Sequence, residues 1–184
     1  HLLLFGINTL SSPKENYDLF NSLIVVDKDL KIKYQYNKQK LVPFGEFLPL
    51  EKQLNKIGLK KITEGHGAFL KGKKQTNFIL DKVEFLPLIC YEIIFPELSK
   101  TSKTKNVIIN ISEDAWFGNS IGPYQHFSKA IFRAIENNVF LIRSANKGIS
   151  AFINNKGVIK KMLKPSETGV IEYYVPIINN NFLN

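Results

Sequence analysis

Short runs of β-branched and large apolar residues recur along this 184-residue chain, and residues typical of turns separate them. Residues 19–26 and 30–36 form the clearest pair, because the Asp-Lys-Asp sequence at 27–29 is a hairpin signal. Pro123 opens a stretch with apolar spacing near 3.6 residues, which predicts a helix through Glu136. Strands therefore alternate with helices, and the pattern predicts the α/β class. The other strand-like runs are 2–7, 77–80, 83–89, 106–111, 139–143 and 148–153.

The length and composition suit one domain. With 44% hydrophobic residues the chain can bury one substantial core, so we expect a single domain over residues 1–184. No stretch reaches the roughly 18 to 20 uninterrupted apolar residues that a bilayer-crossing helix needs, because Glu92 interrupts the longest run, 85–95.

Cys90 is the only cysteine, and it follows directly after the apolar run 83–89. The sequence predicts that a helix starts at this point. A thiol between a strand and a helix gains backbone N–H groups and the positive end of the helix dipole, which favour a thiolate and can bind an oxyanion. A lone cysteine is also commonly a small buried apolar residue, so its location alone leaves both interpretations open.

A metal site is not expected. The three histidines, His1, His66 and His126, show no ligand spacing, and there is no second cysteine. We expect His126 to be a hydrogen-bonded helix residue rather than a base or a ligand.

The chain is basic, with a net charge of +9. Such a charge suits an anionic partner, either nucleic acid or a membrane surface, although a lysine-rich composition bias would give the same value. Residues 50–61 have the spacing of a short amphipathic helix with lysines on one side, which fits a lipid headgroup layer or a solvated surface helix. We do not expect a nucleic-acid partner, because the basic residues are dispersed and form no recognition motif.

Five segments, in order along the chain, resemble the nitrilase-like domain of bacterial apolipoprotein N-acyltransferases, members of the nitrilase or carbon–nitrogen hydrolase superfamily. The third segment is the most specific, because it separates these membrane enzymes from soluble nitrilases and amidases. The segments are YNKQKLVPFGEFLPLE at 36–51, LICYEIIFPE at 88–97, EDAWFGNSIGPYQHF at 113–127, RAIENN at 133–138 and LIRSANKGISAFINNKG at 141–157.

The resemblance implies the α-β-β-α sandwich of that superfamily. It also implies that the first strand-helix layer and the flanking transmembrane helices of these enzymes lie outside the present sequence. The general-base Glu of the family's Glu-Lys-Cys triad belongs to that first layer, so the resemblance implies that this fragment is inactive by itself.

The resemblance assigns Cys90 as the nucleophile and Lys38 as the catalytic lysine, whose ammonium would stabilise the tetrahedral oxyanion. Glu46 matches a second essential carboxylate that could orient Lys38, although a solvated loop residue is the alternative. Tyr91 and Glu92 match residues that flank the nucleophile, and Glu92 could instead cap a helix. Trp116 and Phe117 could line an acyl-chain pocket or be ordinary core aromatics. We expect structural roles for Arg133, Glu136, Arg143 and Asn146.

The implied reaction transfers an acyl chain from a phospholipid such as phosphatidylethanolamine, through a thioester on Cys90, to the amine of a diacylglyceryl-cysteine lipoprotein. It needs no cofactor. The domain is expected to be a monomer at the membrane surface, on the periplasmic face of a bacterial inner membrane. Two alternatives stay open: a soluble carbon–nitrogen hydrolase acting on small amides or nitriles, and a non-catalytic remnant that lacks the general base.

Overall fold

The computed structural model describes residues 1–11, 18–49, 69–74, 77–100 and 106–177. The chain divides into two compact units, residues 1–75 and 76–184, and each is described by itself. The expectation of a single domain stays a prediction. The amphipathic helix predicted at 50–61 lies outside the described residues.

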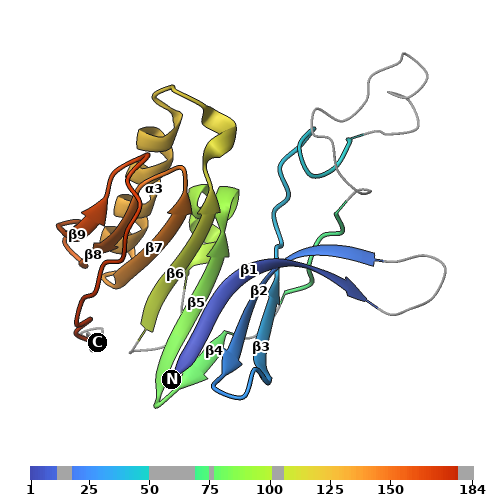
Figure 1. Cartoon of the computed structure of the whole chain (residues 1–184), viewed down its shortest axis with the longest axis horizontal. Helices are drawn as coiled ribbons and strands as arrows, with labels where there is room; N and C mark the ends of the chain where they lie inside the picture. The colour runs from blue at the N-terminus through green and yellow to red at the C-terminus, as the bar shows by residue number, and fades with distance from the viewer. Residues whose placement is uncertain (12–17, 50–68, 75–76, 101–105, 178–184) are drawn as a thin grey trace. The chain divides into compact units, whose positions relative to one another are not determined.

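The first unit contains a three-stranded antiparallel sheet (Figure 1). Its strands are β1 (Leu2–Ser11), β2 (Asp18–Asp27) and β3 (Ile32–Asn37). The hairpin predicted between the second and third strands is confirmed. The Asp27 carboxylate accepts hydrogen bonds from the backbone N–H groups of Asp29 and Lys31, both at 3.0 Å, and so closes the turn from within.

The second unit contains a six-stranded sheet whose spatial order follows the chain (Figure 1). The three central strands β5, β6 and β7 are parallel, and the outer pairings are antiparallel. The carboxyl ends of the parallel strands consequently lie along one edge of the sheet, where loops can present functional groups. The strands are β4 (Phe78–Leu80), β5 (Val83–Ile89), β6 (Asn106–Glu113), β7 (Phe140–Asn146), β8 (Ser150–Ile153) and β9 (Ile159–Leu163).

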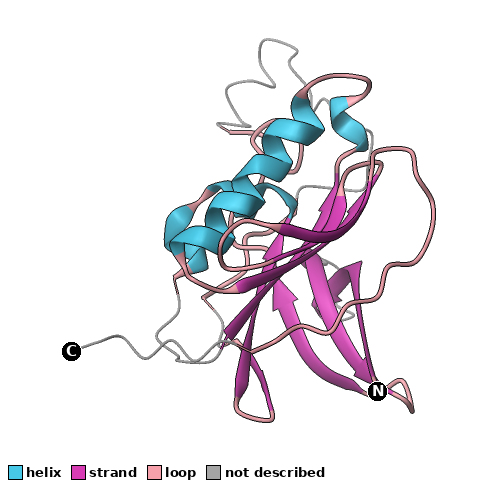
Figure 2. Cartoon of the chain, turned by 90° about the vertical axis from the view of Figure 1, so that its left-hand side faces the viewer, coloured by secondary structure: helices cyan, strands magenta, loops and turns pink. Residues whose placement is uncertain are grey.

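The predicted long helix is confirmed as α3 (Gly122–Glu136), which packs on one face of this sheet (Figure 2). Phe127, Ala130 and Ala134 on α3 are buried against apolar side chains of β5 to β8. The spacing of these three residues is that of one helix face, so burial of the face accounts for the docking of α3 on the sheet. Strands and helices in one unit confirm the α/β class.

The helix predicted after Cys90 is short and divided into two parts. A five-residue 3₁₀ turn, η2 (Cys90–Ile94), is followed by the four-residue α2 (Pro96–Ser99). Pro96 is the cause: it forces the preceding Phe95 into an extended conformation, with φ −96° and ψ 107°, and so ends the first turn. A second 3₁₀ turn, η3 (Ala115–Phe117), follows β6.

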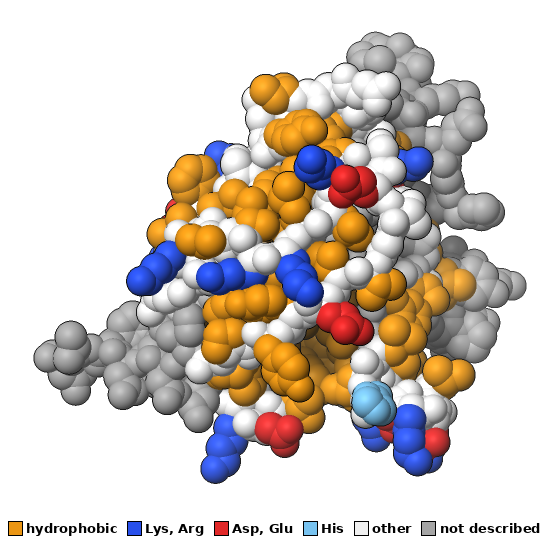
Figure 3. All heavy atoms as spheres, turned by 60° about the vertical axis from the view of Figure 1, so that its left-hand side comes forward, with side chains coloured by type: hydrophobic (Ala, Val, Ile, Leu, Met, Phe, Trp, Pro, Cys, Tyr) orange, Lys and Arg blue, Asp and Glu red, His pale blue; other side chains and the backbone are white. Residues whose placement is uncertain are grey.

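No helix among the described residues is both long and apolar enough to cross a membrane. On the face drawn in Figure 3, the basic side chains of the described residues lie among hydrophobic ones. Several large apolar side chains of the second unit are exposed, including Trp116, Ile121, Tyr124 and Phe132.

Candidate active site

Cys90 occupies the point where β5 ends and the 3₁₀ turn begins. Its φ of +50° lies in the left-handed region, which costs a residue with a side chain about 1–3 kcal/mol. The side chain is half-buried, and its Sγ lies 3.8 Å from the carbonyl oxygen of Glu113 at the end of β6, to which it donates a hydrogen bond. A strained, partly accessible thiol at the carboxyl edge of parallel strands is an arrangement suited to a nucleophile.

Glu92 caps the turn that carries Cys90. It is fully buried, and its Oε2 accepts a hydrogen bond of 2.8 Å from the backbone N–H of Ile89. This contact supports the structural alternative for Glu92. The neighbouring Tyr91 packs edge to face on Phe95, with 5.0 Å between ring centroids.

His126 on α3 contacts the backbone of Cys90. Its Nε2 lies 3.1 Å from the Cys90 carbonyl oxygen, and its Nδ1 lies 2.9 Å from Asp114 Oδ1. The histidine side chain is 5% exposed, and its contact with Asp114 is buried. The prediction that His126 is a hydrogen-bonded helix residue is confirmed.

Asp114 and Arg143 form a buried ion pair behind His126. Arg143 Nη2 donates to Asp114 Oδ2 at 2.8 Å, and neither side chain is exposed to solvent. Ser112 Oγ donates to the other carboxylate oxygen at 2.6 Å. The other two guanidinium nitrogens are also paired, because Nε donates to the carbonyl oxygen of Ile149 at 3.2 Å and Nη1 donates to Asn110 Oδ1.

The ion pair determines the charge of this region. Burial opposes ionisation of Asp114, but the hydrogen bond with His126 and the positive charge of Arg143 outweigh it, and the pKa of the carboxyl lies below its ordinary value. Burial lowers the pKa of Arg143, and the charge of Asp114 offsets part of that effect. Asp114 is therefore a carboxylate at neutral pH.

Trp116 and Phe117 lie on the η3 turn that follows Asp114. Trp116 is 69% exposed and Phe117 is 40% exposed, so neither is an ordinary core aromatic. The Phe117 ring packs beside the His126 ring, with 5.7 Å between centroids. Their predicted contact with an acyl chain stays a prediction.

Lys38 and Glu46 contact each other in the first unit. Lys38 is 1% exposed, and its Nζ lies 2.9 Å from both carboxylate oxygens of Glu46. Glu46 is itself held, because it accepts hydrogen bonds from Asn21 Nδ2 at 2.9 Å and from the backbone N–H of Val42 at 2.8 Å. Glu46 is therefore not the solvated loop residue of the alternative interpretation, and Lys38 does not lie on the surface.

A tight turn brings Glu46 to Lys38. The backbone N–H of Glu46 bonds the carbonyl oxygen of Val42 at 2.9 Å. The residue in the left-handed region is Phe44, with φ +62°, and not the neighbouring Gly45. The chain thus places a rigidly held ammonium group in the first unit.

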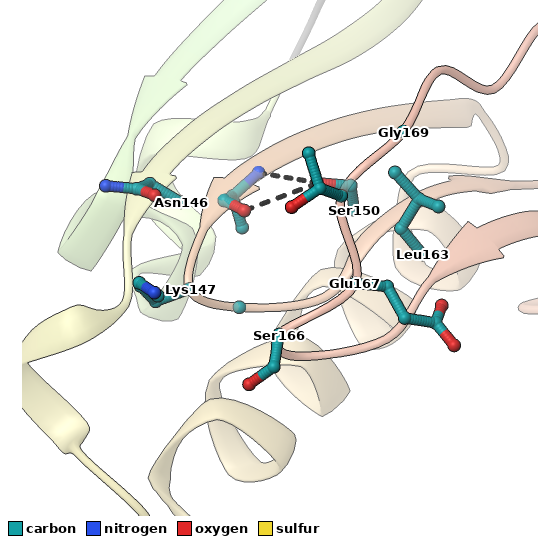
Figure 4. A pocket seen from close by; sticks show the side chains of 10 residues that line it. Asn146, Lys147, Ser150, Leu163, Ser166, Glu167 and Gly169 are labelled. Atoms are coloured by element: carbon teal, nitrogen blue, oxygen red, sulfur yellow. Dashed lines mark hydrogen bonds between the residues drawn. The ribbon is translucent and has the colours of Figure 1, made fainter.

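A polar pocket of about 260 Å³ opens beyond the carboxyl end of β7 (Figure 4). Asn146 links it to the cysteine region, because its Nδ2 donates to Glu113 Oε2 at 2.6 Å. Ser150 and Ala145, which both line the pocket, are joined by a hydrogen bond of 3.0 Å from the backbone N–H of Ala145 to Ser150 Oγ. The lining residues are Ala145, Asn146, Lys147, Gly148, Ser150, Leu163, Ser166, Glu167, Thr168 and Gly169.

Within the described ranges, no group of three or more acidic, histidine or cysteine side chains could hold a metal ion.

The sequence analysis missed Asp114 and Arg143 as partners of His126. Both lie in predicted segments, but their contact joins positions 29 residues apart. The sequence did contain a signal for this contact: Asp114 follows directly after one apolar strand, and Arg143 lies within another. An unpaired polar side chain at either position would be costly.

The family model for carbon–nitrogen hydrolases matches residues 2–177. The chain is 43% identical over 159 residues to the apolipoprotein N-acyltransferase of Brucella suis, covering 85% of this chain and 30% of that protein. It is 38% identical over 177 residues to the enzyme of that name from Rickettsia prowazekii, covering 95% and 35% respectively. The chain thus spans about a third of the length of these curated relatives.

Solved structures share the fold. A Saccharomyces cerevisiae member of the nitrilase superfamily aligns with a TM-score of 0.63 at 21% identity, covering 89% of this chain and 55% of that one. A carbon–nitrogen hydrolase from Helicobacter pylori aligns with a TM-score of 0.64 at 14% identity, covering 91% and 59%. An amidase from Nesterenkonia, described as having an active-site cysteine, aligns with a TM-score of 0.59 at 16% identity, covering 89% and 59%. The chain belongs to the carbon–nitrogen hydrolase family.

Proposed function

We propose that this chain carries the nucleophile and the catalytic lysine of an apolipoprotein N-acyltransferase. The observation that carries the proposal is the strained conformation of Cys90 at the carboxyl edge of the parallel strands, in a chain about 40% identical to curated enzymes of that name. Strained residues of this kind cluster at sites where the conformation serves the chemistry.

In the first step the Cys90 thiol loses its proton and attacks the ester carbonyl carbon of a phospholipid. A tetrahedral oxyanion forms and collapses, the lysophospholipid leaves as an alcohol, and the acyl group remains on sulfur as a thioester. In the second step the α-amine of a diacylglyceryl-cysteine lipoprotein attacks the thioester. The amide product leaves and the thiol is restored, so no oxidant, metal or cofactor enters the balance.

Two groups of this chain are proposed to stabilise the oxyanion: the ammonium of Lys38 and the backbone N–H of Tyr91. Support for Lys38 comes from its burial and its bidentate ion pair with Glu46, which together restrict the ammonium to one position. The general base in this proposal is a glutamate outside these 184 residues, so the fragment alone is proposed to be inactive.

The exposed aromatics Trp116 and Phe117 are proposed to contact the acyl chain of the donor. Their exposure beside the cysteine edge supports this role, because a large solvent-facing indole is available to an apolar ligand. The proposal places the domain on the periplasmic face of a bacterial inner membrane, with phosphatidylethanolamine or a similar lipid as donor.

The test is intact mass spectrometry of the complete gene product in detergent after incubation with phosphatidylethanolamine. We expect a hydroxylamine-labile adduct of one acyl group, absent from Cys90→Ser, and its loss when a diacylglyceryl-cysteine peptide is added. A folded protein that forms no adduct but hydrolyses small amides would refute the acyltransferase assignment in favour of an amidase.

A further inference from the structure

Four polar side chains are buried together behind Cys90, and the acyl-transfer steps above use none of them. Asn110, Asp114, His126 and Arg143 are each at most 6% exposed. We call these four residues the buried polar cluster. Burying such groups is costly unless they are fully paired, so a cluster of this size beside a nucleophile calls for a functional explanation.

The cluster reaches Cys90 through a single hydrogen bond. His126 Nε2 lies 3.1 Å from the Cys90 carbonyl oxygen, which can only accept, so Nε2 must carry the proton and donate. The other ring nitrogen, Nδ1, lies 2.9 Å from Asp114 Oδ1 and 3.2 Å from Arg143 Nη2. The ring is therefore held on its far side, and its Nε2 direction is fixed by the ion pair.

The hydrogen bond from His126 also fixes the orientation of the peptide unit between Cys90 and Tyr91. The Cys90 carbonyl and the Tyr91 N–H belong to the same planar peptide unit and point in opposite directions across it. Holding the carbonyl toward His126 consequently aims the Tyr91 N–H away from the cluster. Cys90 is in the left-handed region, where the backbone has an alternative of lower energy, so the orientation of this peptide needs an external constraint.

We propose that His126 is a positioning residue that sets the Tyr91 N–H as the oxyanion donor. The assignment rests on the proposed acyl chemistry of Cys90, because it concerns the tetrahedral intermediate of that chemistry. His126 touches neither substrate nor sulfur in this proposal, and takes no proton. Asp114 and Arg143 act one step further away by fixing the imidazole.

Two substitutions at His126 separate positioning from general packing. A glutamine amide extends about as far as Nε2 and can still donate to the Cys90 carbonyl, whereas an asparagine amide extends only as far as Nδ1. The control is Ser128→Ala on the exposed side of the same helix, where the hydroxyl bonds only the carbonyl oxygen of Gln125.

Two probes separate the oxyanion from the thiol, both used on the complete gene product. A p-nitrophenyl acyl ester acylates Cys90 through an oxyanion and releases p-nitrophenolate in a measurable burst. Iodoacetamide alkylates the same sulfur by direct displacement and forms no oxyanion. Neither probe is a phospholipid. A protein that forms no adduct with phosphatidylethanolamine would therefore refute the proposed function, but the two probes would still measure the effect of His126 on Cys90.

We expect His126→Asn to lower the acylation rate by at least about tenfold, and His126→Gln and Ser128→Ala to stay within about threefold of wild type. Alkylation should change by less than about threefold in all variants, and the apparent KM for the ester should not rise. Equal losses in the Asn and Gln variants, or acylation and alkylation falling in parallel, would overturn the proposal. If His126→Asn does not fold, a folded His126→Gln that loses about tenfold in acylation overturns it.

Discussion

The ion pair between Asp114 and Arg143 gives the most quantitative prediction. Asp114→Asn keeps the shape of the side chain but removes its charge, so the Arg143 guanidinium is left buried without a counter-ion. Removing one partner of a fully buried pair costs about 3–5 kcal/mol, because the remaining charge stays desolvated. The Asn110 and Ile149 oxygens continue to accept from Arg143, which places the expected loss at the lower end of that range.

The assay is urea unfolding at pH 7, with the free energy of unfolding extrapolated to zero denaturant. A loss of about 3 kcal/mol corresponds to a fall in the unfolding midpoint temperature of roughly 6–12 °C for a protein of this size. The control is Asp81→Asn in the exposed turn between β4 and β5, where φ is +49° and asparagine is well tolerated. That control should change stability by less than about 0.5 kcal/mol.

The pH dependence supplies a second, independent readout. The pKa of Asp114 is lower in the folded protein than its ordinary value, so its carboxylate stabilises the fold at neutral pH. This contribution is complete above pH of about 4 and is lost as the pH falls through the lower folded pKa. The stability gap between wild type and Asp114→Asn should therefore narrow on acidification below that point.

Either of two results would refute the reasoning. A loss below about 1 kcal/mol at pH 7 would show that the Arg143 charge does not depend on Asp114. A gap that stays constant down to pH of about 3 would show that the carboxylate is not the stabilising form.

Two further substitutions test neighbouring contacts. Glu46→Gln leaves the buried Lys38 ammonium beside a neutral amide, and should lower the free energy of unfolding by about 1–3 kcal/mol in urea titrations; an unchanged midpoint would contradict the buried pair. Gly148→Ala would place its methyl group against the Asp114 carboxylate, so it should lower the free energy of unfolding by about 1–3 kcal/mol in thermal melts. Gly169→Ala is the control, because its methyl group would make only an ordinary contact with Leu163, and it should melt like wild type.

The sequence allowed prediction of those elements whose causes are local. The turn at 27–29 formed as expected, because the Asp27 carboxylate bonds N–H groups only two and four residues away. The helix through Glu136 formed because Pro123 can open it and its apolar spacing matches a helix face. The helix predicted after Cys90 is short and divided, because Pro96 holds the preceding Phe95 in an extended conformation.

The burial of Lys38 and the buried polar cluster could not be predicted in the same way. Lys38 lies in a stretch rich in lysine and asparagine, and its burial follows from its pair with a carboxylate eight residues later. Arg143 on β7 pairs with Asp114, which follows directly after the neighbouring parallel strand β6, so the contact depends on strand order. The family resemblance identified Lys38 and Glu46 as a candidate pair, but it gave no information about the contacts that orient the nucleophile.

The conformation of Cys90 is explained by three constraints from different parts of the second unit. The Ile89 N–H bonds Glu92 in the same turn, the Cys90 carbonyl bonds His126 on α3, and the Cys90 thiol bonds the Glu113 carbonyl oxygen on the adjacent strand. A strained residue persists only where its surroundings determine it in several ways. Because these constraints come from a turn, a helix and a strand, the direction of the nucleophile is a consequence of tertiary structure, and a substitution in any one element should leave the thiol present but misdirected.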